Sequence, residues 1–519
     1  MPIKLEIPIL KVTQWLKEWN DVRFDDKKHK DNRKKPIPTF YLFTIKAGLL
    51  KKLSKVYPRR IDEKREIEIG IQRKHDPERS EEIARYIKNG YPLSELMKNK
   101  SSKYDDMYDL RMPGWLPTAI VANILVKDTE RGQNKIAELD LIKIDNIKSK
   151  LILPKAVLKT NWTPKVPPIE IIDGQHRLWA FNSKDGISDE YELPVVAFYD
   201  LDITWQAYLF YTINIKPKKI NRSLAYDLYP LLRVQEWLEK APDTAFVYKE
   251  TRAQELVELL WSFDKSPWKN MINMLGETKS VANITQAAFI RNLIASFIKT
   301  SNIKGLGGLF GSKLNDRFNS PLSWNRTQQA SFLIFVWQIM YEKILKCQED
   351  WAKSLRRVDS TDNLFKDIES NKLDLAFTSR YSLITTDQGV RGFLHIVNDM
   401  IFQLSNTLNL RNISWSISEE SIKEGKIDFK DIEKAIKDLK KSILNNILIK
   451  LCDELIKFDW RTSSEPHLSD EQRRAHMVFK GSSGYKELRS QLLKELLKSK
   501  DHEIKNTAVK IWENLGYAD

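Results

Sequence analysis

Cysteine, glycine and proline are all scarce in this chain. Its 519 residues include 18 glycines, 20 prolines and two cysteines, Cys347 and Cys452. Two distant cysteines with no Cys or His at ligand spacing exclude a zinc finger and a disulfide scaffold. The low glycine and proline contents exclude collagen-like and Pro/Gly-rich low-complexity chains. We therefore expect a globular protein of a reducing compartment, the cytoplasm.

Long apolar runs are also missing. The most apolar stretch, Ala330–Met340, is interrupted by Gln338 and is too short to cross a bilayer. The N-terminal residues carry early charges and no long apolar core, so we expect neither a signal peptide nor a membrane segment. Only seven histidines occur, and no pair has the spacing of metal ligands on a helix.

Positive charge, in contrast, is in excess. Lys and Arg number 85 against 70 Asp and Glu, which gives a net charge of +15. Such a charge points to polyanionic partners only where it is clustered, because dispersed charge mainly confers solubility. Residues 23–35 and 51–64 are rich in lysine and arginine, and we interpret them as solvated surface. A third group, here called the basic cluster, has no acid among its neighbours and comprises Lys216, Lys218, Lys219 and Arg222.

The length and the hydrophobic pattern predict two principal domains and a short N-terminal segment. Residues 1–36 read as an amphipathic helix, Leu10–Trp19, followed by a charged loop. Residues 37–230 alternate strands and helices, with a helix capped by Asp76 and strands at 39–46, 66–72, 118–126, 151–153, 169–172 and 194–199. Residues 231–519 show helical periodicity, with stretches at 231–241 and 430–458 among others, and almost no strand signal. The predicted fold is an α/β (α+β) domain followed by a mostly α-helical domain.

The most unusual segment is IEIIDGQHRLWAF, residues 169–181. An apolar strand delivers Asp173, Gly174, Gln175, His176 and Arg177 to its C-terminal end, just before a helix. Backbone N–H groups and the Arg177 fork suit a phosphate, while Asp173 suits a magnesium ion or a ribose hydroxyl. Gly174 permits a close backbone approach, and Gln175 can orient a water. The alternative is a turn whose aspartate caps the helix and whose arginine pairs with a nearby acid; the residues alone do not decide between the two.

A second candidate follows at the end of the next predicted helix. That helix starts near Thr204 and ends at Asn214, directly before the basic cluster. If Asn214 lies beside Asp173, the two could share a metal ion or a nucleotide, and the basic cluster could face phosphates of a nucleotide or of DNA. On residue types alone, a helix-ending asparagine followed by a solvated basic loop is the simpler interpretation.

Two segments of the helical half resemble anion-binding helix entries. Phe479–Leu493 has a Gly/Ser loop with Lys480 ahead of a helix, although no Walker A pattern is present. Thr385–Asp399 has a similar arrangement. Ordinary loops and helix caps explain both more simply.

The pentapeptide Asp173–Arg177 resembles the defining motif of the DGQHR-domain proteins, the DndB and DpdB relatives within the ParB/sulfiredoxin-like superfamily. Two further pieces fit in the same order. Gly70–Arg73 precedes a helix, Glu78–Ile87, with the family's pattern R…I..YI, and Phe210–Pro217 reads FYTINIKP. The resemblance covers roughly residues 39–230.

The resemblance implies a ParB/sulfiredoxin-like nucleotide-binding core that hydrolyses ATP or another NTP with Mg²⁺. Carried over to this sequence, it assigns catalysis to Asp173, Gln175, His176 and Arg177. It assigns magnesium binding to Asp173 and Asn214. The basic cluster, on its charge alone, stays the candidate DNA contact. The nucleotide-binding residues would be Gln72, Arg73, Gly174, His176, Arg177 and Asn214.

The function that this resemblance implies is that of an ATP-hydrolysing, DNA-binding component of a bacterial DNA-modification or anti-phage system. The modification would be phosphorothioation or 7-deazaguanine insertion, carried out together with a modifying enzyme. The protein could also form a homo-oligomer. One alternative is a non-enzymatic DNA-binding transcriptional regulator of the DndB type. Another is a ParB-like nuclease, against which the lack of a His-rich or multi-carboxylate cluster argues.

Overall fold

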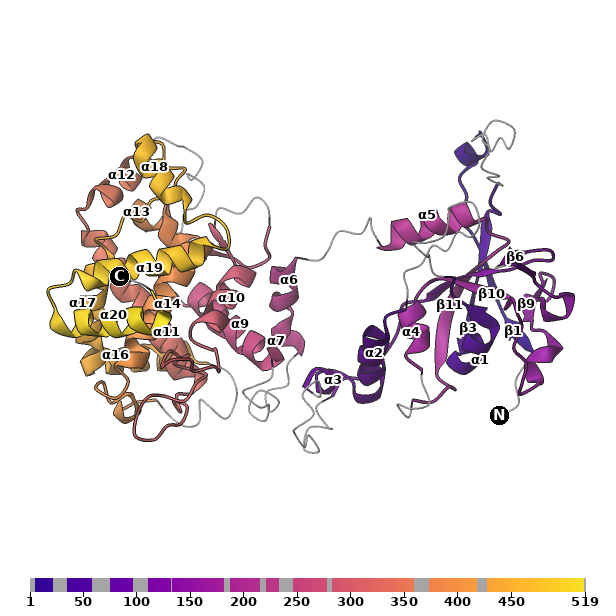
Figure 1. Cartoon of the computed structure of the whole chain (residues 1–519), viewed down its shortest axis with the longest axis horizontal. Coiled ribbons are helices and arrows are strands. Elements are labelled where there is room, and N and C mark those ends of the chain that lie inside the picture. Colours follow the sequence, from indigo (N-terminus) through magenta and orange to yellow (C-terminus); the bar gives the residue numbers. More distant parts are fainter. Residues whose placement is uncertain are drawn as a thin grey trace. The chain divides into compact units, whose positions relative to one another are not determined.

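The chain forms two compact units, Met1–Lys219 (unit 1) and Ile220–Asp519 (unit 2) (Figure 1). The computed structural model describes residues 5–21, 35–57, 75–96, 111–131, 133–181, 187–214, 221–232, 246–277, 282–358, 373–417 and 427–517. Each unit has its own hydrophobic core within these residues, and each is described separately below.

Unit 1 is built on a mixed six-stranded sheet in the order β2-β3-β11-β5-β10-β4. β11 pairs antiparallel with β3 and parallel with β5, while β10 runs antiparallel to β5. A smaller sheet has the order β1-β9-β8. The strands of the two sheets are β1 (Glu6–Pro8), β2 (Leu10–Thr13), β3 (Thr39–Lys46), β4 (Ser54–Lys55), β5 (Ile120–Ile124), β8 (Lys143–Asp145), β9 (Lys150–Ile152), β10 (Ile169–Asp173) and β11 (Glu192–Tyr199). A separate hairpin joins β6 (Glu130–Arg131) and β7 (Asn134–Lys135).

Helix α2 of unit 1 begins and ends where the sequence signals predict. Asp76 caps α2 by accepting hydrogen bonds from the N–H groups of Glu78 and Arg79, and Pro77 occupies its first turn. Gly90 ends this helix with a φ of +70°, a conformation that glycine adopts at little cost. The elements are α1 (Ala47–Leu53), α2 (Pro77–Asn89), α3 (Leu93–Leu96), α4 (Gln175–Trp179), α5 (Ile203–Asn214) and the short 3-10 helices η1 (Lys17–Asp21), η3 (Glu138–Asp140) and η4 (Lys155–Leu158).

The two faces of β10 meet different partners. Ile169 and Ile171 join the core that also contains Leu50 of α1 and Leu178 of α4. Glu170 lies between them in sequence, so its side chain emerges from the opposite face of the pleated strand, where it meets α5. The C-terminal end of β10 is therefore held between helices on both sides.

The predicted helix over Leu10–Trp19 is wrong. Leu10–Thr13 form β2, which pairs antiparallel with the first residues of β3, and Lys17–Asp21 form a 3-10 turn. A helix of ten residues is marginal in water because nucleation is costly. The exposed edge of β3 offers backbone partners at once, so edge pairing prevails over the amphipathic period. The N-terminal segment thereby belongs to unit 1.

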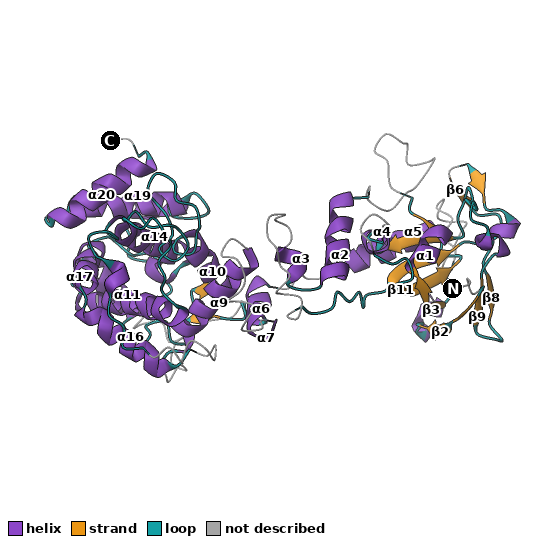
Figure 2. Ribbon diagram, turned by 90° about the horizontal axis from the view of Figure 1, so that it is seen from below, coloured by secondary structure: helices purple, strands orange, loops and turns teal. Residues whose placement is uncertain are grey.

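Unit 2 is helical, and within its described residues the strands are limited to the two-residue pair β12 (Ile272–Asn273) and β13 (Ile284–Thr285) (Figure 2). The predicted helix 430–458 is divided at Ser442 into two, and the predicted helix 231–241 lies mostly outside the described residues. The helices are α6 (Arg222–Asp227), α7 (Tyr229–Leu232), α9 (Phe246–Ser262), α10 (Gln286–Ala295), α11 (Arg326–Lys346), α12 (Asp350–Val358), α13 (Leu375–Thr378), η7 (Leu383–Thr385), α14 (Asp387–Gln403), η8 (Leu410–Asn412), α16 (Phe429–Lys441), α17 (Ile443–Leu455), α18 (Asp470–Met477), α19 (Gly484–Leu497) and α20 (His502–Leu515).

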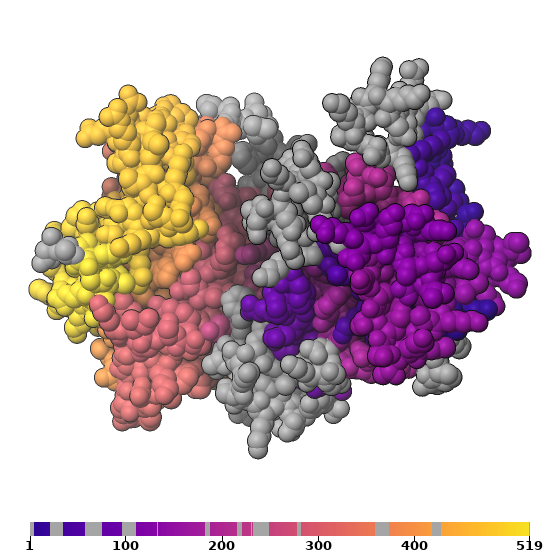
Figure 3. Space-filling model, turned by 45° about the vertical axis from the view of Figure 1, so that its right-hand side comes forward, coloured from indigo at the N-terminus to yellow at the C-terminus, as the bar shows by residue number. Residues whose placement is uncertain are grey.

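Bulky aromatic side chains fill the centre of unit 2. Trp268 is fully buried and makes edge-to-face contacts with Phe289, Trp337 and Phe377 at centroid distances of 5.1, 5.0 and 5.4 Å. Such pairs add to the hydrophobic gain from burial. The last part of the chain, yellow in Figure 3, forms a continuous outer surface of this unit.

The predicted fold class is confirmed: an α/β unit precedes a helical one. The predicted strand 66–72 lies outside the described residues. Among the helices that the structure describes, none has the length and apolar character needed to cross a membrane.

Candidate functional site

The turn at Asp173–Arg177 is shaped by a bulge and a glycine. The register between β10 and β5 shifts between Ile171 and Asp173, and such bulges re-aim the side chain that follows. Gly174 then adopts φ +95° and ψ +16°. A Cβ atom there would lie 2.6 Å from Cδ1 of Ile120 and 2.9 Å from Nη2 of Arg177, so only glycine fits without displacing a neighbouring side chain.

Asp173 is the centre of the site. Its Oδ2 accepts a hydrogen bond from Nη2 of Arg177 at 2.9 Å, and its Oδ1 accepts one from Nδ2 of Asn214 at 3.1 Å. Arg177 also donates through Nη1 to the carbonyl oxygen of Thr118 at 2.6 Å. Residues from the ends of β10, α4 and α5 thus converge at a single carboxylate.

The structure brings Asn214 to Asp173, as the candidate site requires, although Asn214 also ends its helix. The simpler interpretation of the turn is half right. Arg177 does pair with an acid, Asp173, but that acid caps no helix, because Gly174 occupies the N-cap position without a side-chain bond. The pairing satisfies both charges and also fixes the guanidinium plane at the edge of the cavity.

A buried carboxylate on the other face of β10 holds α5 in place. Glu170 is only 3% exposed, and its Oε2 accepts a hydrogen bond from Nε2 of Gln206 in α5 at 3.0 Å. Arg131 binds the same carboxylate through Nη2 at 2.8 Å and Nε at 3.2 Å. Because a buried carboxylate is costly without such partners, this network fixes the direction in which α5 carries Asn214 toward Asp173.

His176 lies beside this cluster in a partly buried position. Its ring stacks on that of His75 with centroids 5.5 Å apart, and its Nδ1 atom has no hydrogen-bond partner among the described residues. Burial lowers the pKa of His176, and the positive charge of Arg79 lowers it further. The imidazole is therefore neutral at pH 7 and able to accept a proton.

These residues line a cavity of about 590 Å³, which has the volume of a small-molecule site. Arg79, Ile83, Leu116 and Phe210 complete the lining. The lining includes two arginines against one carboxylate, so its charge favours anions. Burial lowers the pKa of Arg177, but a guanidinium keeps its proton throughout the physiological range.

Arg79 is the residue that the site assignment from sequence missed. It is exposed, lies in the first turn of α2 and reaches the cavity because α2 packs against α4. The sequence did contain a signal for Arg79, since it is the first residue of the R…I..YI pattern. Its place in the site depends on packing between two helices that are far apart in the sequence.

The described residues include no group of three or more His, Cys, Asp or Glu side chains able to hold a metal ion. Asp173 is the carboxylate of the cavity, and the amide of Asn214 is its polar neighbour. Mg²⁺ commonly binds through one or two carboxylates together with substrate phosphates. The donor set therefore fits a magnesium ion that arrives with a nucleotide and does not fit a resident ion held by protein alone.

Several predicted site residues are not tested by the geometry. Gln72, Arg73 and the three lysines of the basic cluster lie outside the described residues. Arg222 is exposed at the start of α6 in unit 2, whereas the Asp173 cavity belongs to unit 1.

A comparison with protein-family models decides the family. The model described as "DndB: DNA-sulfur modification-associated" matches residues 38–300, just over half of the chain. The protein belongs to the DndB family. Membership associates it with DNA modification, and the family description names sulfur. The match continues past unit 1 through α10, so it also covers the first helices of unit 2. Neither a curated protein nor a solved structure gives a match.

Proposed function

We propose that this DndB family member binds a nucleotide in the Asp173 cavity and hydrolyses its terminal phosphoanhydride, with ATP as the expected substrate. The observation that carries this proposal is the convergence of Arg79, Arg177, His176 and Asn214 around Asp173 in a cavity of nucleotide size. Two guanidinium groups recognise phosphate oxygens through paired hydrogen bonds, and the cavity has space for more than a bare phosphate.

Each residue has a distinct role in this proposal. Arg177, held in orientation by Asp173 and Thr118, presents its guanidinium to the phosphates, and Arg79 contacts them from the mouth of the cavity. These charges stabilise the transition state of in-line attack by water on the terminal phosphorus. The water oxygen bonds to phosphorus as the bond to the bridging oxygen breaks. His176, whose neutral imidazole lines the cavity, accepts the proton of that water.

Magnesium is the expected cofactor, with Asp173 and Asn214 holding it. Each carboxylate oxygen of Asp173 accepts one hydrogen bond here and has a second lone pair to offer. When bound, the ion would neutralise phosphate charge. Gln175, buried at the start of α4, would orient the attacking water.

We further propose that the protein acts on DNA beside a modifying enzyme of the same system, as a monomer or as a homo-oligomer. The net charge of +15 supports DNA binding, and the basic cluster directly after α5 is the expected contact. The family description favours sulfur modification over 7-deazaguanine insertion. A DndB-type transcriptional regulator without enzymatic activity is the alternative.

Phosphate release from ATP tests the hydrolysis proposal. We expect the wild type to release phosphate with Mg²⁺, measured with and without duplex DNA. Asp173→Ala and Arg177→Ala should each lower the rate by a factor of about 100 or more. Arg177→Ala removes the charge that stabilises the transition state, and Asp173→Ala removes the carboxylate that orients that charge. Circular dichroism verifies that the variants fold. Equal background-level release from all three proteins would contradict hydrolysis, and sequence-selective DNA binding in that case would support the regulator.

The role of Arg79 has its own test. Arg79→Gln should weaken nucleotide binding about tenfold through the loss of one charge-assisted contact, with little change in melting temperature because the side chain is exposed. Lys88→Gln is the matched control, since Lys88 is an exposed cation on the same helix that does not line the cavity. Isothermal titration with a non-hydrolysable ATP analogue measures both. If the two variants bound equally well, Arg79 would have no role in phosphate binding.

A further inference from the structure

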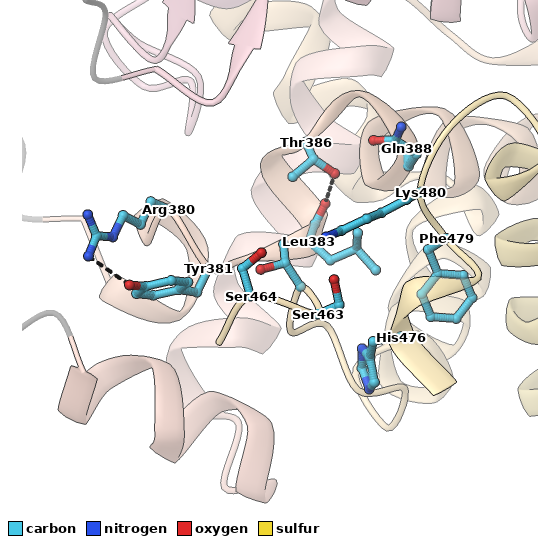
Figure 4. A pocket seen from close by; sticks show the side chains of 11 residues that line it. Arg380, Tyr381, Leu383, Thr386, Gln388, Ser463, Ser464, His476, Phe479 and Lys480 are labelled. Carbon is cyan, nitrogen blue, oxygen red and sulfur yellow. Dashed lines mark hydrogen bonds between the residues drawn. The ribbon is translucent and has the colours of Figure 1, made fainter. Parts of the chain in front are cut away.

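Unit 2 contains a second cavity, which is not part of the Asp173 site. It has a volume of about 600 Å³ and lies where η7 and the start of α14 meet the loop 462–464 and the segment after α18 (Figure 4). The backbone joins these segments: Leu383 N–H donates to the carbonyl of Trp460, and Thr462 N–H donates to that of Tyr381. The two loops that resembled anion-binding helix entries in the sequence, near residues 386 and 480, thus meet at one cavity.

The lining of this cavity is cationic and carries no carboxylate. Lys480 extends across it in Figure 4, and no ion-pair partner for its ammonium group occurs among the described residues. Arg380 lies at its edge, where it donates to the Tyr381 hydroxyl. A cavity lined by cationic and hydroxyl side chains, with no acidic side chain, favours anions.

The acids next to the lining residues are engaged elsewhere. Asp387 accepts hydrogen bonds from Nδ2 of Asn292 and from the hydroxyl of Tyr485. Asp459 accepts hydrogen bonds from Arg461 and lies 3.5 Å from Nε2 of His476. Burial alone would raise the pKa of Asp459, but the bonds from His476 and Arg461 lower it to about 2. Its negative charge is thus balanced by its own partners, and it does not line the cavity.

The start of α14 supplies backbone donors. Thr386 caps this 17-residue helix by accepting from the N–H of Gly389. Val390 N–H also bonds to Thr386, so the N–H groups of Asp387 and Gln388 are left without an intrahelical partner. Gln388 lines the cavity. A helix start binds anions readily, but this feature needs a second observation.

Ser463 provides that observation. Its side chain lines the cavity and is only 5% exposed, yet its Oγ has no hydrogen-bond partner among the described residues. In Figure 4 this hydroxyl points toward the space beneath Lys480. A buried hydroxyl without a partner costs free energy, so it calls for an acceptor that the protein does not provide.

We propose that this cavity binds the phosphate group of a phosphate ester. Phosphate oxygens are strong acceptors, and they would satisfy Ser463, the N–H groups at the start of α14 and the Lys480 ammonium together. The volume exceeds that of a bare phosphate and fits a nucleotide-sized ester, whose base could lie on the faces of Phe479 or Tyr381. A free nucleotide and a DNA strand offer the same group. This proposal rests on residues of unit 2 alone and does not depend on the nucleotide hydrolysis proposed for unit 1.

The test titrates the full-length protein with inorganic phosphate, with a deoxynucleoside monophosphate and with a short DNA duplex. Hydrogen exchange should fall in peptides covering 459–464 and 476–490 when the effective ligand is added. Lys480→Gln and Ser463→Ala should each weaken binding about tenfold. Protection by the monophosphate identifies a free nucleotide as the source, and protection by the duplex alone identifies DNA.

Two controls separate ligand binding from folding. Lys437→Gln removes an equal charge from an exposed position on α16 and should bind as the wild type does. Without ligand, Ser463→Ala should melt at the wild-type temperature or above it, because it removes an unpartnered group. The proposal is overturned if Ser463→Ala and Lys480→Gln bind like the wild type. It is also overturned if no ligand protects these peptides, or if Arg177→Ala alone abolishes binding.

Discussion

Gly174→Ala is expected to lower nucleotide turnover about a hundredfold, because a small misplacement of a catalytic group has effects of this size. The new Cβ would lie 2.6 Å from Cδ1 of Ile120 and 2.9 Å from Nη2 of Arg177. Ile120 is packed in the core, whereas Arg177 lies at the cavity. The guanidinium is the movable end of a side chain, so it is the group that gives way. Its displacement breaks the pairing with Asp173 and removes the phosphate contact that we propose for it.

Gly174→Ala should have only a small effect on the free energy of unfolding. An alanine at φ +95° is strained by about 1–2 kcal/mol. Gly516→Ala is the matched control: Gly516 has φ +70°, and a Cβ there would meet nothing within 4 Å. It should show similar strain in denaturant unfolding and normal phosphate release. If Gly174→Ala retained more than half of the wild-type turnover, the position of Arg177 would not matter for catalysis.

Trp268→Ala is expected to lower the free energy of unfolding of unit 2 by about 3–5 kcal/mol. Trp268 is fully buried and contacts three aromatic rings, so its truncation leaves a cavity that the rigid core cannot close. Hydrogen exchange of the full-length protein measures the effect by region. Protection should fall in α10, α11 and α13, which carry these three rings, and stay unchanged in β3 and β11 of unit 1.

Trp268→Phe distinguishes loss of volume from loss of a polar group. The indole Nε1 of Trp268 has no hydrogen-bond partner among the described residues, so its removal sacrifices no bond. A ring remains to pack against Phe289 and Trp337, and we expect a loss of about 1.5 kcal/mol or less. Equal losses for the alanine and phenylalanine variants would show that ring packing is not what stabilises this core.

Local signals in the sequence were sufficient for much of unit 1. The β-branched run at 169–172 and the pair Asp76–Pro77 predicted β10 and the start of α2, because strand preference and helix capping depend on near neighbours. The same reasoning failed at Leu10–Thr13. There the deciding factor was an open strand edge about thirty residues away, which no local pattern contains.

The sequence by itself determined the fold class and the five residues of the turn, since an apolar strand, a glycine and a cluster of polar side chains are adjacent in the chain. Tertiary structure decided everything that joins distant segments. It set Asn214 against Asp173 through the buried Glu170–Gln206 contact, and it brought Arg79 to the cavity through the packing of α2 on α4. It also gathered the loops near 386, 463 and 480 around a second cavity. Periodicity and capping reveal which residues face inward, but only the packing of whole elements decides which of them meet.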